Sequence, residues 1–260
     1  MSTQYLFVIM LGRSDWSMTE KVVDLHVGKR LHLGCGMKYF DGYINIDYPR
    51  SEQTVQSKLI ADHYVDIVKL QYPTDSIDEI RLHHVFEHFP RQIALALLCR
   101  WTDWLKPGGL LRIETPDVMA SAWKLVSPFT SSDTRQQVVR HLFGSHEAAW
   151  AAHWDGWYKK RFALTLSALG FGNLRFIRTR WGALHNIEVV AERGKRTYTL
   201  SDYERIIGGL LKKSQVTHAT GRFVTAIAES EREMLEIWMR EWKSTYTAGH
   251  DDIMLPIETN

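Results

Sequence analysis

The sequence contains little cysteine and almost no net charge. Its 260 residues include two cysteines, Cys35 and Cys99, and 32 basic residues nearly balance 30 acidic ones, which leaves a net charge of +2. Two cysteines this far apart, in a chain with no secretory signal, indicate reduced thiols in a cytoplasmic protein and exclude a disulfide framework. The small net charge argues against long nucleic acid as a partner.

Long hydrophobic runs are also absent. The apolar segment Tyr5 to Leu11 is too short to span a bilayer, and it lacks the basic start and the small-residue cleavage site of a secretory signal. We therefore expect no transmembrane segment. An apolar content of 45% is nevertheless ordinary for a globular protein with a full core.

The stretch Arg30 to Asp47, RLHLGCGMKYFDGYINID, contains the pattern most informative about a ligand. A short apolar strand at Leu31–Leu33 leads into a Gly-Cys-Gly turn, and a second strand at Tyr43–Ile46 ends on Asp47. A glycine turn lets the backbone approach a ligand closely, because no side chain blocks it. An acid at the end of the next strand can accept both hydroxyls of a ribose. The pattern predicts a nucleoside site at the carboxyl ends of a parallel sheet.

The spacing disfavours a dinucleotide as the ligand. The dinucleotide fingerprint needs a third glycine, whereas here Met37–Tyr39 follow the turn and Gly42 is the next glycine. The acid Asp47 comes eleven residues after the turn, not the roughly twenty of a dinucleotide-binding unit. A nucleoside without phosphate fits better, and S-adenosylmethionine (SAM) is the common one.

These motifs resemble those of class I SAM-dependent methyltransferases of the type-11 kind. LHLGCG is similar to the first motif of that family, and GYINID to its second strand and ribose acid. The further matches come in the order of the family: Asp66-Ile67 at the adenine position, IDEIRLHHVFEHF at the fourth strand, WLKPGGLLRIETPD (Trp104 to Asp117) at the turn into the fifth strand, and LSALGFGNLRFI and HNIEVVAER at the closing helix and final hairpin. The resemblance covers roughly residues 25 to 193.

The resemblance and the alternation of strands with helices imply an α/β fold. We expect a Rossmann-like, seven-stranded, mostly parallel sheet with helices on both faces and an antiparallel edge hairpin. The methyltransferase domain would span 1–193, with an insertion at 117–157 near the acceptor pocket, and 194–260 would form a helical C-terminal extension. The resemblance implies SAM as the cofactor. The cofactor-binding residues that we expect are Gly34, Cys35, Gly36, Asp47, Asp66, Ile67 and His83.

Periodicity predicts the individual elements. The expected strands are Arg30–Leu33, Tyr43–Ile46, Ile80–His83, Leu110–Thr115, Leu174–Thr179 and Ile187–Ala191, and the expected helices are Gln92–Leu105, Gln136–Phe143 and Phe162–Leu169. Pro107-Gly108-Gly109 should form the turn that ends the first of these helices. After Gly194, a helix capped by Ser201-Asp202 has an apolar stripe, and a second helix should begin near Thr220. The pair would either pack on the domain as a hairpin or assemble chains as a short coiled coil, giving a homo-oligomer.

The candidate catalytic residues follow the fourth strand. Methyl transfer from a sulfonium mainly needs an acceptor held in line with the methyl group, but a hydroxyl acceptor also needs a base or a metal. His84, Glu87 and His88 have the spacing H-x-x-E-H. Zinc proteases have this spacing on a helix, whereas here it straddles a strand end and a loop. Three interpretations stay open: loop-ordering groups, a histidine as general base, or a divalent metal site.

A metal is suggested by a second resemblance. Small-RNA 3′-end methyltransferases and some ubiquinone-pathway O-methyltransferases have E-x-x-E-H at this location and bind magnesium or a similar ion. This sequence has His84 in place of the first glutamate. Further along, His146 and His153 either lie on the surface or face the methyl group from the acceptor side. His185-Asn186 is interpreted as structural.

The acceptor is inferred from the family alone. Relatives of this motif set often accompany glycosyltransferases in surface-glycan pathways, so the resemblance implies transfer to a hydroxyl of a sugar or glycan intermediate. A small aromatic or amine metabolite is the alternative acceptor. A third hypothesis is a non-catalytic partner subunit with the same fold.

Overall fold

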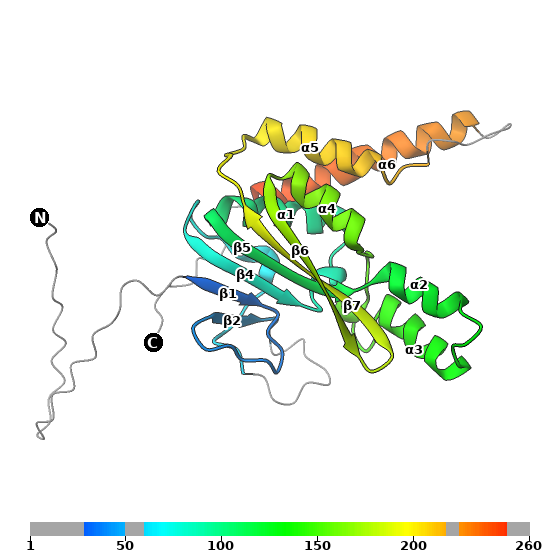
Figure 1. Cartoon of the computed structure of the whole chain (residues 1–260). Coiled ribbons are helices and arrows are strands. Elements are labelled where there is room, and N and C mark those ends of the chain that lie inside the picture. Colours follow the sequence, from blue (N-terminus) through cyan, green and yellow to red (C-terminus); the bar gives the residue numbers. More distant parts are fainter. Residues whose placement is uncertain (1–28, 50–59, 217–223, 249–260) are drawn as a thin grey trace, which may run out of the picture.

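The computed structural model describes residues 29–49, 60–216 and 224–248, with side chains up to 216 and again from 228. Seven strands form one sheet in the order β3-β2-β1-β4-β5-β7-β6 (Figure 1). The strands are β1 (Arg30–Leu33), β2 (Ile44–Asp47), β3 (His63–Tyr64), β4 (Ile77–His83), β5 (Leu105–Pro116), β6 (Phe171–Trp181) and β7 (Leu184–Arg193). β1 to β5 pair in parallel, whereas β7 is antiparallel to β5 and β6. The mostly parallel sheet with an antiparallel edge hairpin confirms the predicted fold class.

The strand order reverses between β1 and β4. From β1 the chain proceeds outward to β2 and β3, then returns to place β4 on the other side of β1. Leu33 pairs with Ile46 of β2 and with Leu82 of β4, so all three strands end at one level. The loops after β1 and β4 therefore run in opposite directions and leave a crevice at the carboxyl ends of the strands. Ligands bind at this place in open α/β sheets.

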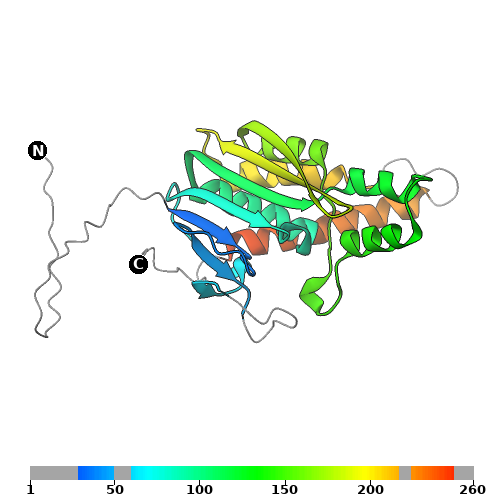
Figure 2. The ribbon, with the colours of Figure 1, turned by 60° about the horizontal axis from the view of Figure 1, so that its bottom comes forward.

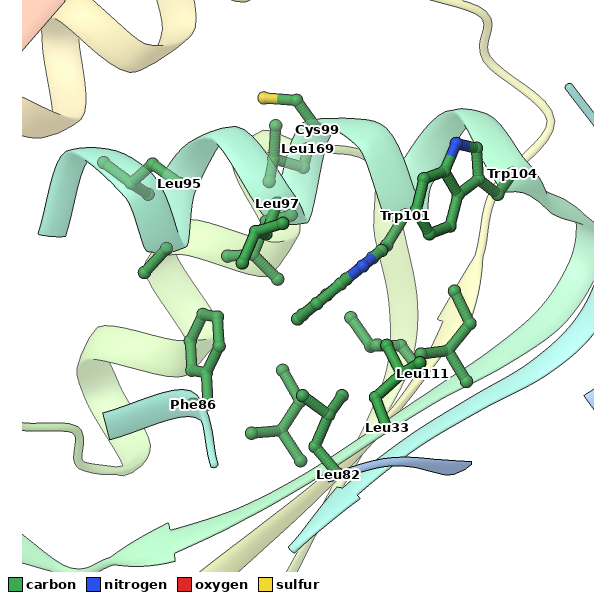
Figure 3. Close-up of a cluster of buried hydrophobic side chains, with 14 of the residues drawn as sticks. Leu33, Leu82, Phe86, Leu95, Leu97, Cys99, Trp101, Trp104, Leu111 and Leu169 are labelled. Atoms are coloured by element: carbon green, nitrogen blue, oxygen red, sulfur yellow. The ribbon is translucent and has the colours of Figure 1, made fainter. Parts of the chain in front are cut away.

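One face of the sheet is apolar and forms the core. Leu31 and Leu33 of β1, and the alternate residues of β4 and β5, are buried on this face, because side chains along a strand point to opposite faces in turn. In Figure 3, Leu33, Leu82 and Leu111 from three neighbouring strands point toward Trp101 of helix α1 (Arg91–Trp104). Helix α4 (Lys159–Ala168) contributes Phe162 and Leu166 to the same core.

The opposite face of the sheet is polar and is bridged by ion pairs. Glu79 contacts Arg112 at 2.8 Å and Arg81 at 3.8 Å, and Arg112 contacts Glu188 at 3.6 Å. The predicted helices are therefore distributed unevenly over the two faces. Helices α1, α5 (Leu200–Lys212) and α6 (Val224–Thr247) lie on the apolar side (Figure 1 and Figure 2), whereas α2 (Val118–Val126) and α3 (Ser132–Phe143) lie at the carboxyl end of β5.

The largest local correction concerns the Pro-Gly-Gly segment. It does not separate α1 from the next strand, because β5 begins at Leu105, directly after the helix. Ile77 pairs with Leu105 and Glu79 pairs with Leu110, so residues 106–109 form a bulge opposite a single residue of β4. A Cβ on Gly109 would lie 2.8 Å from the carbonyl oxygen of Lys106, which explains the glycine.

Smaller corrections concern the ends of elements. β2 begins and ends one residue later than predicted. β6 and β7 extend beyond the predicted strands, because their hairpin pairing continues past the apolar residues from which the strands were predicted. Helix α5 is capped by Thr199 in a capping box with Asp202, not by Ser201. The start of α6 near Thr220 lies outside the described residues. No helix in the described ranges is long and apolar enough to cross a membrane.

The two C-terminal helices share the core with α1. Tyr203, Ile207 and Leu211 of α5 and Trp242 of α6 are fully buried in the main hydrophobic cluster. The Tyr203 hydroxyl donates to Asp103 of α1 at 2.7 Å. The apolar stripe of α5 is thus used inside the chain, as the hairpin interpretation predicts. A domain boundary near residue 193 and a homo-oligomer stay predictions.

Candidate functional site

The turn after β1 has a geometry that favours glycine. The amides of Gly34 and Cys35 donate to the carbonyl of Ile46 at 2.8 and 3.0 Å, which ties the turn to β2. Gly34 has φ +69° and Gly36 has φ +54°, both in the left-handed region. A Cβ on Gly34 would also lie 2.2 Å from Cγ2 of Val85. The turn therefore passes directly against the loop that follows β4.

Asp47 lies at the end of β2 beside this turn. Its carboxylate accepts hydrogen bonds from the amide of Gly36 and from the amide of Tyr48, the latter at 2.6 Å. Only 7% of the residue is exposed. The two amides therefore orient the carboxylate. Burial and the nearby Asp47 raise the pKa of the Cys35 thiol to about 12, so this side chain stays protonated and acts as packing.

A cavity of about 900 Å³ opens between these strands, a volume typical of small-molecule sites. All seven residues predicted to bind the cofactor line it: Gly34, Cys35, Gly36, Asp47, Asp66, Ile67 and His83. Asp66 also caps the short helix η2 (Ile67–Lys69), where Oδ1 accepts from the amide of Val68 at 3.0 Å. The structure brings the seven residues together, and their role toward a cofactor stays a prediction.

His83 forms part of the cavity floor on the polar face of the sheet. Its Nδ1 lies 3.4 Å from Nε2 of His32, whose Nδ1 lies 3.1 Å from the side-chain oxygen of Asn45. Burial, helped by the positive charge of Lys38, lowers the pKa of His83 to about 4. The ring is therefore neutral near pH 7 and can contribute hydrogen bonds without adding charge.

His84 and Glu87 form a hydrogen-bonded pair at the mouth of this cavity. His84 has φ +52°, an uncommon conformation for a residue other than glycine. Its Nδ1 lies 3.2 Å from Oε1 of Glu87, and its Nε2 lies 3.9 Å from Glu114, too far for a hydrogen bond. Burial alone would lower the pKa of His84, but the bond to Glu87 and the charges of Glu87 and Glu114 raise it. The arrangement orients Nε2 as a free basic nitrogen.

A second cavity, of about 680 Å³, shares His84 with the first. His84, His88, Trp150 and Trp181 line both cavities. The second cavity also has several polar walls, contributed by Gln137, Arg140, His141, Glu147 and His153. Two adjoining cavities with a shared histidine wall can hold two reactants on either side of one set of titratable groups.

The predicted histidines of the insertion separate into two environments. His153 lies in the second cavity beside His88, with ring centroids 4.7 Å apart. His146 is exposed, bonds to the carbonyl of Phe143 at 2.7 Å and lines neither cavity. The geometry gives no support to His146 as a catalytic residue, because its loop turns the side chain back onto the end of α3.

Glu114, Thr179 and Asn186 line the first cavity and were not predicted as site residues from the sequence. Glu114 of β5 accepts from the hydroxyl of Thr179 at 2.6 Å and lies near the side-chain amide of Asn186 at 3.3 Å. Glu114 pairs with His83 across two parallel strands, and this pairing could have indicated it as a neighbour of the site. Asn186 also contacts His141 of α3 at 2.9 Å, so it has the structural role predicted for it as well as a place on the cavity wall.

Comparison with known proteins gives low-identity structural likeness. No protein-family description and no curated protein matches the chain. A possible exported protein from Bordetella parapertussis is 18% identical over 64% of this chain and 62% of its own, with a TM-score of 0.42.

Two methyltransferases match similarly. The Burkholderia thailandensis 1,6-didemethyltoxoflavin-N1-methyltransferase, solved with S-adenosylhomocysteine, is 16% identical over 65% of this chain and 72% of its own, with a TM-score of 0.43. Human N-acetylserotonin methyltransferase in complex with SAM is 18% identical over 66% of this chain and 49% of its own, with a TM-score of 0.40. This chain spans less than two thirds of the Bordetella and human chains. Likeness of this degree assigns neither a family nor an activity.

Proposed function

We propose that this protein transfers a methyl group from SAM to a hydroxyl of a sugar or glycan intermediate. The observation that carries the proposal is the placement of Asp47 and the glycine turn in one cavity with His84, whose Nδ1 contacts Glu87. The first pair suits a nucleoside, and the second suits proton removal from an acceptor. Both lie where the strand order reverses.

In this proposal the cofactor occupies the larger cavity. Asp47 accepts both ribose hydroxyls, and Asp66 and Ile67 contact the adenine. The turn at Gly34 and Gly36 passes under the methionine part, where a side chain would block the approach. The strand order supports this orientation, because the turn follows β1, Asp47 ends β2 and Asp66 follows β3, which is the order of the methionine, ribose and adenine parts of SAM.

In the proposed reaction the acceptor lies in the second cavity. Its hydroxyl gives its proton to Nε2 of His84, and its oxygen attacks the methyl carbon while the bond from that carbon to sulfur breaks, with the electron pair going to sulfur. Glu87 holds Nδ1 of His84 and so keeps Nε2 turned toward the acceptor. Holding the oxygen in line with the methyl group contributes the remaining rate enhancement.

The lining of the second cavity supports a polyhydroxylated acceptor. Gln137, Arg140 and Glu147 offer donors and acceptors for several hydroxyls, and Trp150 and Trp181 offer aromatic surface at the border with the first cavity. A small aromatic or amine metabolite would use the same aromatic surface without engaging most of these polar groups.

The proposal is tested in two steps on the full chain. Isothermal titration with SAM and with S-adenosylhomocysteine measures cofactor binding, and labelled SAM then reports methyl transfer to a panel of nucleotide sugars, catechols and amines. We expect binding of both cofactor forms and transfer to nucleotide sugars. Binding without transfer to any acceptor or cell extract would favour the non-catalytic partner subunit, and no binding of either form would refute the proposal.

A further inference from the structure

We propose that Glu87, His88 and His153 together bind one divalent transition-metal ion. Glu87 and His88 belong to the short helix η3 (Phe86–His88) after β4, and His153 comes from the loop before α4. One ligand atom from each of the three side chains lies within 4.8 Å of the other two. Neighbouring ligand atoms of a tetrahedral ion with bonds of about 2.0–2.2 Å lie about 3.3–3.6 Å apart, so the three side chains would draw together by small rotations on binding.

The backbone holds the two segments in this arrangement. The carbonyl of Glu87 accepts from the amide of Trp154 at 2.9 Å and from the amide of Asp155 at 3.3 Å. The amide of His153 donates to the carbonyl of Phe143 at 3.0 Å. Main-chain bonds on both sides of His153 therefore set its position beside η3, independently of any interaction of its side chain.

Two atoms of these side chains are buried and have no hydrogen-bond partner among the described residues. They are Oε2 of Glu87 and Nδ1 of His153. Glu87 is only 2% exposed, and its other oxygen already contacts His84. An unpaired buried carboxylate oxygen is unfavourable unless a cation or a donor compensates it. A cation between the three side chains would satisfy both atoms at once.

His88 is in the tautomer that metal binding needs. Its Nδ1 lies 3.1 Å from the carbonyl oxygen of Ala152. A carbonyl oxygen can only accept, so Nδ1 carries the proton and Nε2 keeps its lone pair. Histidine ligands in metal sites usually donate their other N–H to such a carbonyl, which fixes the ring and raises the basicity of the ligating nitrogen.

The ligand set indicates the class of ion. Two imidazole nitrogens and one carboxylate suit zinc, manganese, iron or cobalt in the divalent state, whereas magnesium prefers oxygen ligands. His84 is not one of the three clustered ligands, and its Nδ1 contacts Oε1 of Glu87. The histidine that replaces the first glutamate of the magnesium-dependent motif thus orients a ligand instead of supplying one.

Three protein ligands leave coordination positions open, as in catalytic metal sites. His88 lines both cavities and His153 lines the second. The ion would therefore face the acceptor side, where it could bind an acceptor hydroxyl or a pair of neighbouring hydroxyls and lower their pKa. This role rests on the proposed function, whereas the binding site itself does not.

The test uses the full chain after dialysis against a chelator. Isothermal titration with zinc, manganese and magnesium salts, without SAM, measures the affinity and the number of sites. Glu87→Gln and His153→Gln remove single ligands, and His146→Ala removes an exposed histidine of the same loop that takes no part in the cluster. Thermal unfolding shows whether each variant is folded.

We expect one site for zinc or manganese in the parent, with magnesium binding at least about tenfold more weakly. Each ligand variant should lose about tenfold or more in affinity, and His146→Ala should be unchanged. Equal affinity in the parent and both ligand variants, or no site in the parent, would overturn the proposal. If the variants do not fold, anomalous diffraction from metal-soaked crystals of the parent decides, because the peak must lie between the three side chains. A metal site in a chain that binds no SAM would refute only the proposed function.

Discussion

Removing the Asp47 carboxylate should remove most of the affinity for SAM. The carboxylate is 7% exposed and already oriented by the amides of Gly36 and Tyr48, so its bonds to ribose hydroxyls would be shielded from water. Hydrogen bonds to a charged group contribute about 1.5–3 kcal/mol each, so losing two of them costs on the order of 3 kcal/mol or more. That free energy corresponds to a dissociation constant roughly 150-fold higher for Asp47→Ala. Isothermal titration with SAM measures it directly.

The variant also removes the acceptor for two backbone amides, and this effect must be separated from the loss of ribose contacts. A cofactor analogue without ribose hydroxyls, titrated against the parent and Asp47→Ala, completes a double-mutant cycle. We expect the analogue to bind both proteins about equally. Asp41→Ala, which changes an exposed aspartate of the same loop, should bind SAM as the parent does. SAM affinity within threefold of the parent in Asp47→Ala would refute the assignment.

Three further predictions concern the turn, the catalytic pair and the C-terminal helices. Gly34→Ala should lower the free energy of unfolding by roughly 1–2 kcal/mol from the left-handed backbone alone, and should weaken SAM binding because its methyl group would collide with Val85. Gly42 has a similar backbone conformation but open space around it, so Gly42→Ala is the control. A loss of SAM binding in Gly42→Ala would show that the collision is not the cause. His84→Gln should lower turnover by roughly 100-fold or more and leave SAM affinity unchanged, and full turnover in this variant would rule out His84 as the base. Trp242→Ala should lower the free energy of unfolding by about 3–5 kcal/mol, measured by denaturant unfolding. Ile237→Ala, at a residue 44% exposed on the same helix, should change it little. Equal effects of the two substitutions would contradict the packing of α6 on α1.

The packing of Trp242 also bears on a shortened chain. A chain that ends at Arg193 would lack Tyr203 and Tyr246, whose hydroxyls donate to Asp103 and, from Tyr203, to the carbonyl of Cys99. Such a chain should be insoluble or lose its cooperative unfolding. Retained solubility with full SAM binding would instead support the helices as a separate C-terminal extension, as predicted from the sequence.

The sequence by itself determined the part of the site that is local. The glycine turn and Asp47 lie within one short stretch, so strand periodicity and turn chemistry were enough to place them side by side, because two short parallel strands joined by a tight loop have few alternative arrangements. Their lining of one cavity with Asp66 and His83 follows from the same strand order.

Only the tertiary structure decided which distant residues meet. His153 reaches His88 from 65 positions away along the chain, and nothing in the spacing of the insertion distinguishes it from His146, since a loop has no periodicity that assigns a face. The stripe on α5 fits a coiled coil and a packed hairpin equally well, because both bury the same apolar side chains. The choice between them depended on α1, whose Asp103 accepts from Tyr203. The local pattern of apolar residues determines which side chains are buried, and the long-range packing of the sheet and helices determines which residues they contact.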